Sequence, residues 1–214
     1  MLANARPRGK RAPECAPMQL EIVAIGLAGL LAGAHHALTG PDHMAGVAPL
    51  VARAERRPWR IGFSWGLGHA GGALIAAGIA LALRSRIPGL EEQLSALSER
   101  VVGLVLCVIG ALGLRAALRR EQAKHAHEHS AFGLGLVHGA AGLSHLYAVV
   151  PSLALPGVAL PASYLGGYAA GCLGALTVFA AVLGRMPRKH ARVWLGVTSG
   201  ASLATGLVWI VRPM

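Results

Sequence analysis

Long apolar stretches separated by short polar segments make up most of this chain. Each stretch approaches or exceeds the roughly 20 residues that a helix needs to cross the hydrocarbon layer of a membrane. Glycine and alanine are frequent within the stretches, as is typical of membrane helices that pack closely together. We therefore predict an all-α, polytopic membrane bundle of about six helices, at residues 20–51, 61–83, 100–118, 131–158, 162–184 and 191–211.

Two of these stretches contain the same unusual arrangement of polar residues. The first reads HALTGPDHMAGVAPL from His36 to Leu50, and the second reads HGAAGLSHLYAVVPSL from His138 to Leu153. Alignment of the two segments pairs His36 with His138, Gly40 with Gly142, and His43 with His145. Three spans in each half would make the halves enter the membrane from opposite sides. We predict a 3+3 inverted repeat, with broken helices at the histidine motifs and a binding site at the midplane.

The repeat divides the chain into simple parts. Residues 1–17 form a basic tail without apolar periodicity, which we predict to be disordered, and 18–214 form a single transmembrane domain. Within that domain, repeat 1 covers about 20–118, a histidine-rich loop covers 119–130, and repeat 2 covers about 131–212. The sequence leaves open whether translation starts at Met1 or at Met18.

A helix break is predicted between the first two histidines of the motif. Pro41 lacks a backbone donor and disfavours helical conformation at Gly40. Broken backbone is tolerated in a bilayer only where it faces protein or a wet cavity. In one continuous helix, His36 and His43 would lie about 10 Å apart, too far to share an ion. The break can bring them closer, or each can serve a successive site along a path.

Composition supports a membrane protein whose partner is lipid. Only 14% of residues are charged, against about 25% in soluble domains. The net charge of +11 lies largely in loops between spans, which argues against nucleic acid as a partner. Three basic loops fall on one side, and the positive-inside rule places them in the cytoplasm of a cell, with an inner-membrane location and both termini outside. The histidine-rich loop is then cytoplasmic too.

Polar side chains inside a membrane are costly and usually mark an ion or substrate path. Imidazoles with one carboxylate suit Ni(II), Co(II), Zn(II) and Cu(II) rather than alkali ions. A buried Asp42 without compensation would bind a proton or a cation. Cys172 lies near the position of His69 in the second repeat, and we interpret it as a packing residue. The candidate metal ligands are His36, Asp42, His43, His69, His138 and His145, with weaker candidates at His35, His125, His127 and His129.

Two motifs resemble a known family. HALTGPDHMAG, followed by GFSWGLGHAGG, is similar to the histidine-aspartate-histidine and leucine-glycine-histidine motifs of the nickel/cobalt transporter superfamily. The closest likeness is to its small urease-accessory membrane branch. The resemblance implies that His36, Asp42 and His43 are metal ligands or relays and that His69 belongs to the second motif. It also implies transport of Ni(II) or Co(II), without an organic cofactor, and metalloenzyme maturation proteins as possible partners.

We therefore expect a secondary permease for Ni(II) or Co(II), supporting a nickel enzyme such as urease or hydrogenase. The sequence has no Walker P-loop, so a gradient or a partner would supply the energy. The alternatives are a membrane accessory protein that holds metal without moving it, and an intramembrane haem or metal enzyme. An HExxH protease motif is absent from the sequence, and we do not expect an enzyme. The metal, the direction, the coupling ion and the oligomeric state stay open.

Tryptophans near the ends of the predicted spans have a separate interpretation. Indole rings concentrate at membrane–water interfaces, where one end of the ring system is apolar and the other is polar. We therefore expect four interface anchors, at Trp59, Trp65, Trp194 and Trp209.

Overall fold

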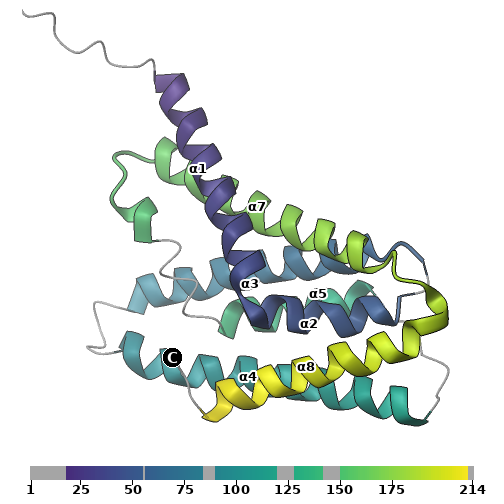
Figure 1. The fold of residues 1–214 in the computed structure, drawn as a ribbon. Helices are drawn as coiled ribbons and strands as arrows, with labels where there is room; N and C mark the ends of the chain where they lie inside the picture. Colours follow the sequence, from purple (N-terminus) through teal and green to yellow (C-terminus); the bar gives the residue numbers. More distant parts are fainter. Residues whose placement is uncertain (1–17, 55, 84–89, 120–127, 142–149, 212–214) are drawn as a thin grey trace, which may run out of the picture.

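The chain is all-helical throughout the part that the structure describes. The computed structural model describes residues 18–54, 56–83, 90–119, 128–141 and 150–211, and these contain helices and turns without a strand (Figure 1). Several predictions fall outside these residues. They concern the tail at 1–17, with the possible translation start at Met1, and the candidate ligands His125, His127 and His145. The prediction of an all-α fold is confirmed.

The helices follow the predicted apolar stretches closely, except at the start of the third stretch and along the fourth. The elements are α1 (Met18–Thr39), α2 (Pro41–Ala52), α3 (Trp59–Leu83), α4 (Leu90–Arg119), α5 (Glu128–Ala141), α7 (Ala159–Leu183), η1 (Arg188–His190) and α8 (Ala191–Val211). In the third stretch, α4 begins ten residues before the predicted start of its span. In the fourth, predicted at 131–158, α5 ends at Ala141, residues 150–153 are helical again, and residues 154–158 form turns and bends.

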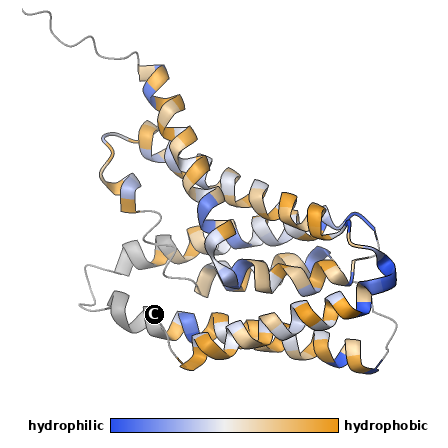
Figure 2. Cartoon of the chain, viewed as in Figure 1, coloured by the Kyte–Doolittle hydropathy of each residue, from blue (hydrophilic) through white to orange (hydrophobic). Residues whose placement is uncertain are grey.

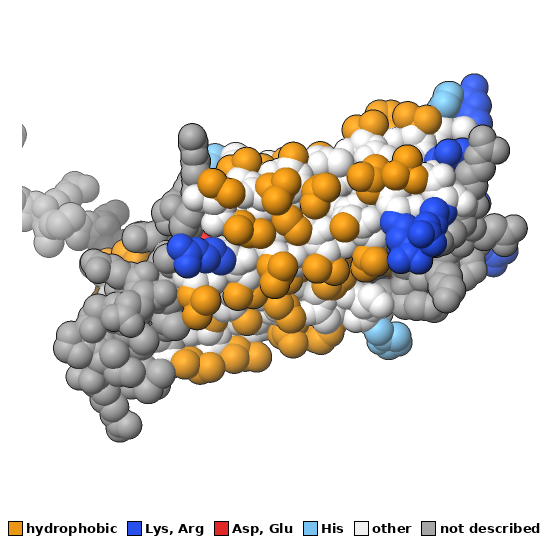
Figure 3. Space-filling view, turned by 90° about the horizontal axis from the view of Figure 1, so that it is seen from below, with side chains coloured by type: hydrophobic (Ala, Val, Ile, Leu, Met, Phe, Trp, Pro, Cys, Tyr) orange, Lys and Arg blue, Asp and Glu red, His pale blue; other side chains and the backbone are white. Residues whose placement is uncertain are grey.

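Four helical segments are long and apolar enough to cross a membrane. They are Met18–Thr39, Leu97–Arg119, Ala159–Leu183 and Arg188–Val211. Large apolar side chains also cover much of the outer surface, and Figure 3 shows them as a broad belt with Lys and Arg gathered near its ends. These features identify a membrane protein by length and composition. The count of six spans and the 3+3 repeat stay predictions.

Basic side chains gather at one end of the helix bundle. Figure 2 shows strongly hydrophilic colouring where α2 is followed by α3 and where α7 is followed by α8. The residues there include Arg56, Arg57, Arg185, Arg188 and Lys189, all of them exposed. Arg60 at the start of α3 also forms an ion pair with Glu128 at the start of α5, with 3.2 Å between Nη1 and Oε1. The starts of α3 and α5 therefore lie at this same end.

The first predicted span is interrupted at Gly40, as the proline predicts. Helix α1 ends at Thr39 and α2 begins at Pro41, the position where a missing backbone donor costs least. Figure 1 shows that the two helices run in different directions from this point. The φ of Gly40 is −72°, which any residue can adopt. Glycine matters here for space, because a Cβ at this position would contact the side chains of His43 and Asp42.

Three helix pairs form the most extensive contacts of the bundle, namely α1 with α7, α3 with α5, and α4 with α8. Small residues allow these close approaches. The Gly33 backbone lies against the carbonyl of Tyr168, and the Gly135 backbone lies against the carbonyl of Trp65. Gly139 lies against the carbonyl of His69 in the same way. The pairing of α3 with α5 therefore places His69 beside the helix that carries His138.

Substitution of Gly139 by alanine is expected to destabilise the protein. An added Cβ would collide with the backbone carbonyl of His69. A backbone group in a helix cannot move aside as the end of a flexible side chain can. Overpacking of this kind typically costs about 1–3 kcal/mol. Gly133→Ala on the same helix is the matched control, since a Cβ there meets nothing within 4 Å. Thermal unfolding in detergent measures both variants, and equal melting temperatures would contradict this account of the α3–α5 contact.

Candidate metal centre

Five polar side chains from four helices converge in the interior of the bundle. His36 comes from α1, Asp42 and His43 from α2, His69 from α3, and His138 from α5. Four of them are almost fully buried, with exposures of 4% for Asp42, 1% for His43, 2% for His69 and 0% for His138. His36 is partly buried. The helix break at Gly40 places these groups where α1 meets α2.

Asp42 connects two of the histidines. The Nδ1 of His43 donates a hydrogen bond to Oδ1 of Asp42 at 3.1 Å. The second carboxylate oxygen, Oδ2, lies 3.0 Å from Nε2 of His138. A carboxylate that accepts from one nitrogen of an imidazole fixes the ring so that the other nitrogen can bind a metal, an arrangement common around metal sites. Asp42 can therefore orient His43 as well as bind an ion directly.

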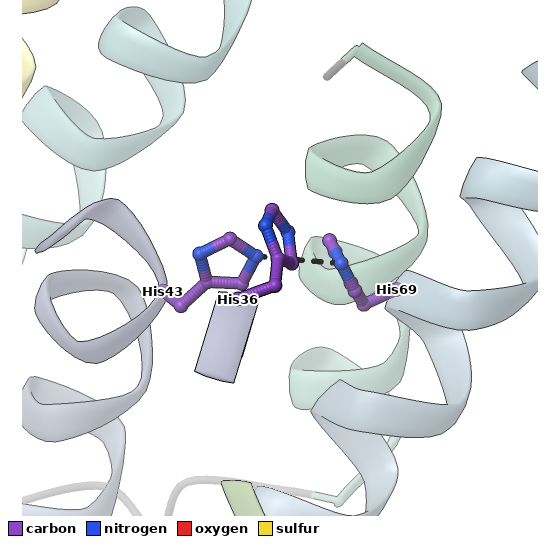
Figure 4. Close-up of side chains that lie close together, drawn as sticks. All are labelled: His36, His43 and His69. Carbon is purple, nitrogen blue, oxygen red and sulfur yellow. Dashed lines mark hydrogen bonds between the residues drawn. The ribbon is translucent and has the colours of Figure 1, made fainter. Parts of the chain in front are cut away.

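The second nitrogen of His43 faces another imidazole. Its Nε2 lies 3.4 Å from Nε2 of His69, and the ring of His36 lies 4.7 Å from that of His43, centroid to centroid. Figure 4 shows the three rings converging. Two nitrogens that each bind a tetrahedral ion at about 2.0–2.1 Å would themselves lie about 3.3–3.4 Å apart. The spacing of His43 and His69 therefore matches two ligands of one ion.

The five side chains form two overlapping groups of three. In the first group, ligand atoms of His36, His43 and His69 all lie within 4.8 Å of one another. In the second group, the same holds for Asp42, His43 and His138. His43 belongs to both groups. Each group has the donor number and donor types that transition-metal ions use in proteins.

Two aromatic side chains contact the outer histidines. The Trp65 ring lies 5.5 Å from that of His138, and the Tyr168 ring lies 5.8 Å from that of His36.

The interpretation of Trp65 as an interface anchor was wrong, since its side chain is 0% exposed. Trp209 is buried as well, at 9% exposure. Both were assigned by their distance from the predicted span ends, which says nothing about the face of the helix they occupy.

Two further candidates within the described residues, His35 and His129, lie away from this cluster. His35 is exposed, because it is one position from His36 and therefore points to a different side of α1. His129 is exposed at the start of α5, nine residues or about 14 Å along the helix from His138. Cys172 is buried, and its Sγ donates to the carbonyl of Gly33 at 3.2 Å, which is the packing role expected for it.

The sequence reasoning missed a buried acid. Glu99 in α4 is only 3% exposed, although it belongs to EEQLSALSER, a segment rich in polar residues just before the third predicted span. Ser199 and Ser202 in α8 are fully buried too, and the Ser202 hydroxyl donates to the carbonyl of Leu106 at 2.9 Å. The apolar residues at positions 102 and 106, which share a helix face with residue 99, were the available signal for Glu99.

Comparisons with known proteins found two similar plant proteins. The chain is 33% identical to the Arabidopsis thaliana "Chloroplast protein FOR GROWTH AND FERTILITY 2", in a match over 76% of this chain and 48% of the relative. It is 30% identical to "Chloroplast protein FOR GROWTH AND FERTILITY 1" of the same plant, over 86% of this chain and 58% of the relative. The chain thus spans about half the length of the curated relatives it matches. No family model and no solved structure matches the chain.

These comparisons overturn the resemblance inferred from the histidine motifs. The similar proteins are the two chloroplast proteins, rather than nickel/cobalt transporters or their urease-accessory branch. The resemblance rested on short segments around His36 and His69, in which histidine, aspartate and glycine recur. Histidine and aspartate recur at buried polar sites in unrelated membrane proteins, because their chemistry suits ion binding. The motifs therefore indicated a chemistry and were wrongly taken to indicate a family.

Proposed function

We propose that this chain is a secondary permease for divalent transition-metal cations, which bind among His36, Asp42, His43, His69 and His138. The supporting observation is the convergence of four nearly fully buried polar side chains, three imidazoles and one carboxylate, inside a largely apolar bundle. Burial of such groups in hydrocarbon is costly, and they are usually retained for an ion path. The function is transport of a substrate ion, and no enzymatic activity or organic cofactor is proposed.

The donor set selects the class of ion. Neutral imidazole nitrogen suits borderline ions such as Zn(II), Ni(II), Co(II) and Cu(II), whereas Mg(II) and Ca(II) prefer oxygen ligands. The 3.4 Å between the Nε2 atoms of His43 and His69 supports a small ion with short metal–nitrogen distances. The donor set does not separate nickel from cobalt or zinc. A link to a nickel enzyme depended on the family resemblance and is not proposed.

The proposal includes six membrane crossings arranged as a 3+3 inverted repeat. Glycine contacts support the repeat, because a contact made by residues of one repeat has a counterpart made by the residues at nearly constant sequence separation in the other repeat. The contact of Gly33 with Tyr168 corresponds to that of Gly135 with Trp65. The two glycines are 102 positions apart, and Trp65 and Tyr168 are 103 positions apart. In each case a glycine of a motif-bearing helix lies against a backbone carbonyl of a helix in the other half.

The third helix pair fits the same relation. Gly103 of α4 and Gly206 of α8 lie against each other's carbonyls and are 103 positions apart. Gly103 also lies against Ile210, and Gly206 lies against Cys107. Cys107 and Ile210 are themselves 103 positions apart. A two-fold axis that exchanges the halves would produce contacts of this kind. The contacts of His36 with Tyr168 and of His138 with Trp65 correspond in the same way.

The basic end of the bundle supports an orientation. The exposed residues at the α2–α3 and α7–α8 connections include many arginines, and the positive-inside rule places such an end on the cytoplasmic side of a cell membrane. We accordingly propose a multi-pass protein with this end on the cytoplasmic side of the inner membrane. The two relatives are chloroplast proteins by name, so a chloroplast membrane is the alternative location for this chain.

Metal flux in proteoliposomes tests the proposal. Purified protein is reconstituted, and uptake of Co(II), Ni(II), Zn(II) and Mn(II) is followed by elemental analysis of the washed vesicles. We expect uptake of one or more of the first three ions above that of protein-free vesicles, and little uptake of Mn(II), which prefers oxygen ligands. His35→Ala, adjacent to the site but exposed, should transport normally. Binding without flux would instead support an accessory protein that holds metal.

A further inference from the structure

We propose that the buried cluster consists of two metal stations that share His43, and that the ion passes from one to the other across this ring. Station A is the group His36, His43 and His69, and station B is the group Asp42, His43 and His138. This inference deepens the proposed transport function and rests on it.

The orientation of His43 separates the two stations. Its Nδ1 faces Asp42 at 3.1 Å, and its Nε2 faces His69 at 3.4 Å. The lone-pair directions of the two ring nitrogens diverge, so a single ion cannot bind both. With His43 placed in this way, the five side chains cannot surround one ion. An ion bound through Nε2 belongs to station A, and an ion bound through Nδ1 belongs to station B.

A shared neutral imidazole permits one occupied station at a time. Neutral imidazole carries one proton, and the nitrogen that holds it cannot bind metal. When the ion is in station A, the His43 proton stays on Nδ1 and continues to donate to Asp42. When the ion is in station B, Nδ1 binds the metal and the proton resides on Nε2, facing His69. As the ion moves, the ring therefore releases one proton from Nδ1 and takes up one proton at Nε2, so that its charge is the same in both states.

The two stations differ in charge. Station A contains three imidazoles, which are neutral when they bind metal, whereas station B contains the carboxylate of Asp42, which is buried between His43 and His138. Attraction between a cation and a carboxylate in direct contact is stronger in a buried site than in water. Station B should therefore bind a divalent ion more tightly, and station A should bind and release it more easily.

Different aromatic rings flank the two stations. Tyr168 of α7 lies against His36 in station A, and Trp65 of α3 lies against His138 in station B. These aromatic residues belong to different halves of the chain. A substrate path with one station on each side of His43 would meet a different aromatic ring at each outer histidine.

Cobalt binding to single variants tests the two stations. Co(II) is added to the detergent-purified full chain, its stoichiometry is measured by elemental analysis, and its visible absorption reports the ligand set. The variants His36→Gln and His138→Gln each remove one station's unique histidine and retain most of the side-chain volume. The control is His35→Gln, at an exposed position. Size-exclusion chromatography verifies that each variant is folded.

We expect the wild type to bind one equivalent of Co(II). His36→Gln should retain one equivalent with the wild-type spectrum and affinity, because the tighter station B is intact. His138→Gln should also retain binding, with affinity weakened about 10–100-fold and a different spectrum, because the ion then occupies station A. The double variant should lose binding. Flux in proteoliposomes should fall in both single variants, because the path needs both stations.

Other results would overturn the inference. Complete loss of cobalt binding in folded His36→Gln or His138→Gln protein would show one composite site, as would identical altered spectra in the two variants. Two equivalents bound at once by the wild type would exclude a shared neutral His43. Absence of flux in the wild type, with the two variant spectra still distinct, would refute transport and leave both stations established.

Discussion

Replacement of His43 by alanine is expected to abolish both metal binding and metal flux. This side chain is 1% exposed and contributes to both groups of three potential ligands. Its loss also removes the hydrogen bond that holds one oxygen of Asp42. Change of a single orienting partner around a metal typically costs 10–100-fold in affinity, and loss of a shared ligand should cost at least roughly 100-fold. Isothermal titration and proteoliposome flux measure the two losses.

Two controls separate this effect from misfolding. His35→Ala changes the same residue type at an exposed position and should retain wild-type affinity and flux. The melting temperature of metal-free His43→Ala protein should show that the bundle still folds. Metal ions should raise the melting temperature of the wild type, since a ligand that binds only the folded state stabilises it, and they should leave that of His43→Ala unchanged. Normal flux by folded His43→Ala protein would refute the metal path.

Substitution of Gly40 by alanine is expected to damage the site, although alanine normally favours helices. A Cβ at this position would contact Nδ1 of His43 and Oδ1 of Asp42, the two atoms that share a hydrogen bond. The His43 ring must turn or move to make room. Because disturbance of a group that orients a metal ligand typically changes metal affinity by 10–100-fold, we expect a loss in that range, measured by competition with a chelating dye.

Gly133→Ala is the matched control for this substitution, because its added methyl group meets nothing within 4 Å. It should leave the affinity unchanged. If Gly40→Ala binds metal as tightly as the wild type, the side chains of Asp42 and His43 do not hold the described positions when an ion is bound. A parallel measurement of the melting temperature distinguishes local damage to the site from a general loss of stability.

Local physics accounts for how well the sequence predicted the helices. The predicted span 191–211 coincides with α8, and Pro41 marks the break between α1 and α2. Both depend only on neighbouring residues: the length of an apolar run and the missing donor of proline. The pairing of α3 with α5 depends on the three-dimensional arrangement. GxxxG spacing alone does not identify a partner in a chain with 29 glycines.

The candidate ligands were predictable in type and only partly in arrangement. His36, Asp42, His43, His69 and His138 stand out because polar groups are rare in apolar spans, and the structure brings all five together. The bridging position of Asp42 between His43 and His138 was not predictable, since it depends on how α2 and α5 face each other. Burial of Trp65 and Glu99 was missed because distance from a span end does not define a helix face.

Motif likeness and overall likeness gave different answers for this chain. Segments near His36 and His69 resembled a transporter superfamily, whereas the matches over most of the chain are to two chloroplast proteins. The discrepancy has a physical basis, since a buried imidazole site at a broken helix tolerates few residue types. The matches over 76% and 86% of the chain extend far beyond the short motif segments and therefore carry more information about descent.

Helix α1 joins α2 at Gly40 and packs mainly against α7, apart from the helices that carry the other ligands. His36 is thus attached to the bundle differently from His43, His69 and His138. A small bend at that glycine would withdraw one imidazole and lower the coordination number of an ion from three protein nitrogens to two. An ion in station A would then be released by the loss of a single ligand, without any change in the packing of the other helices.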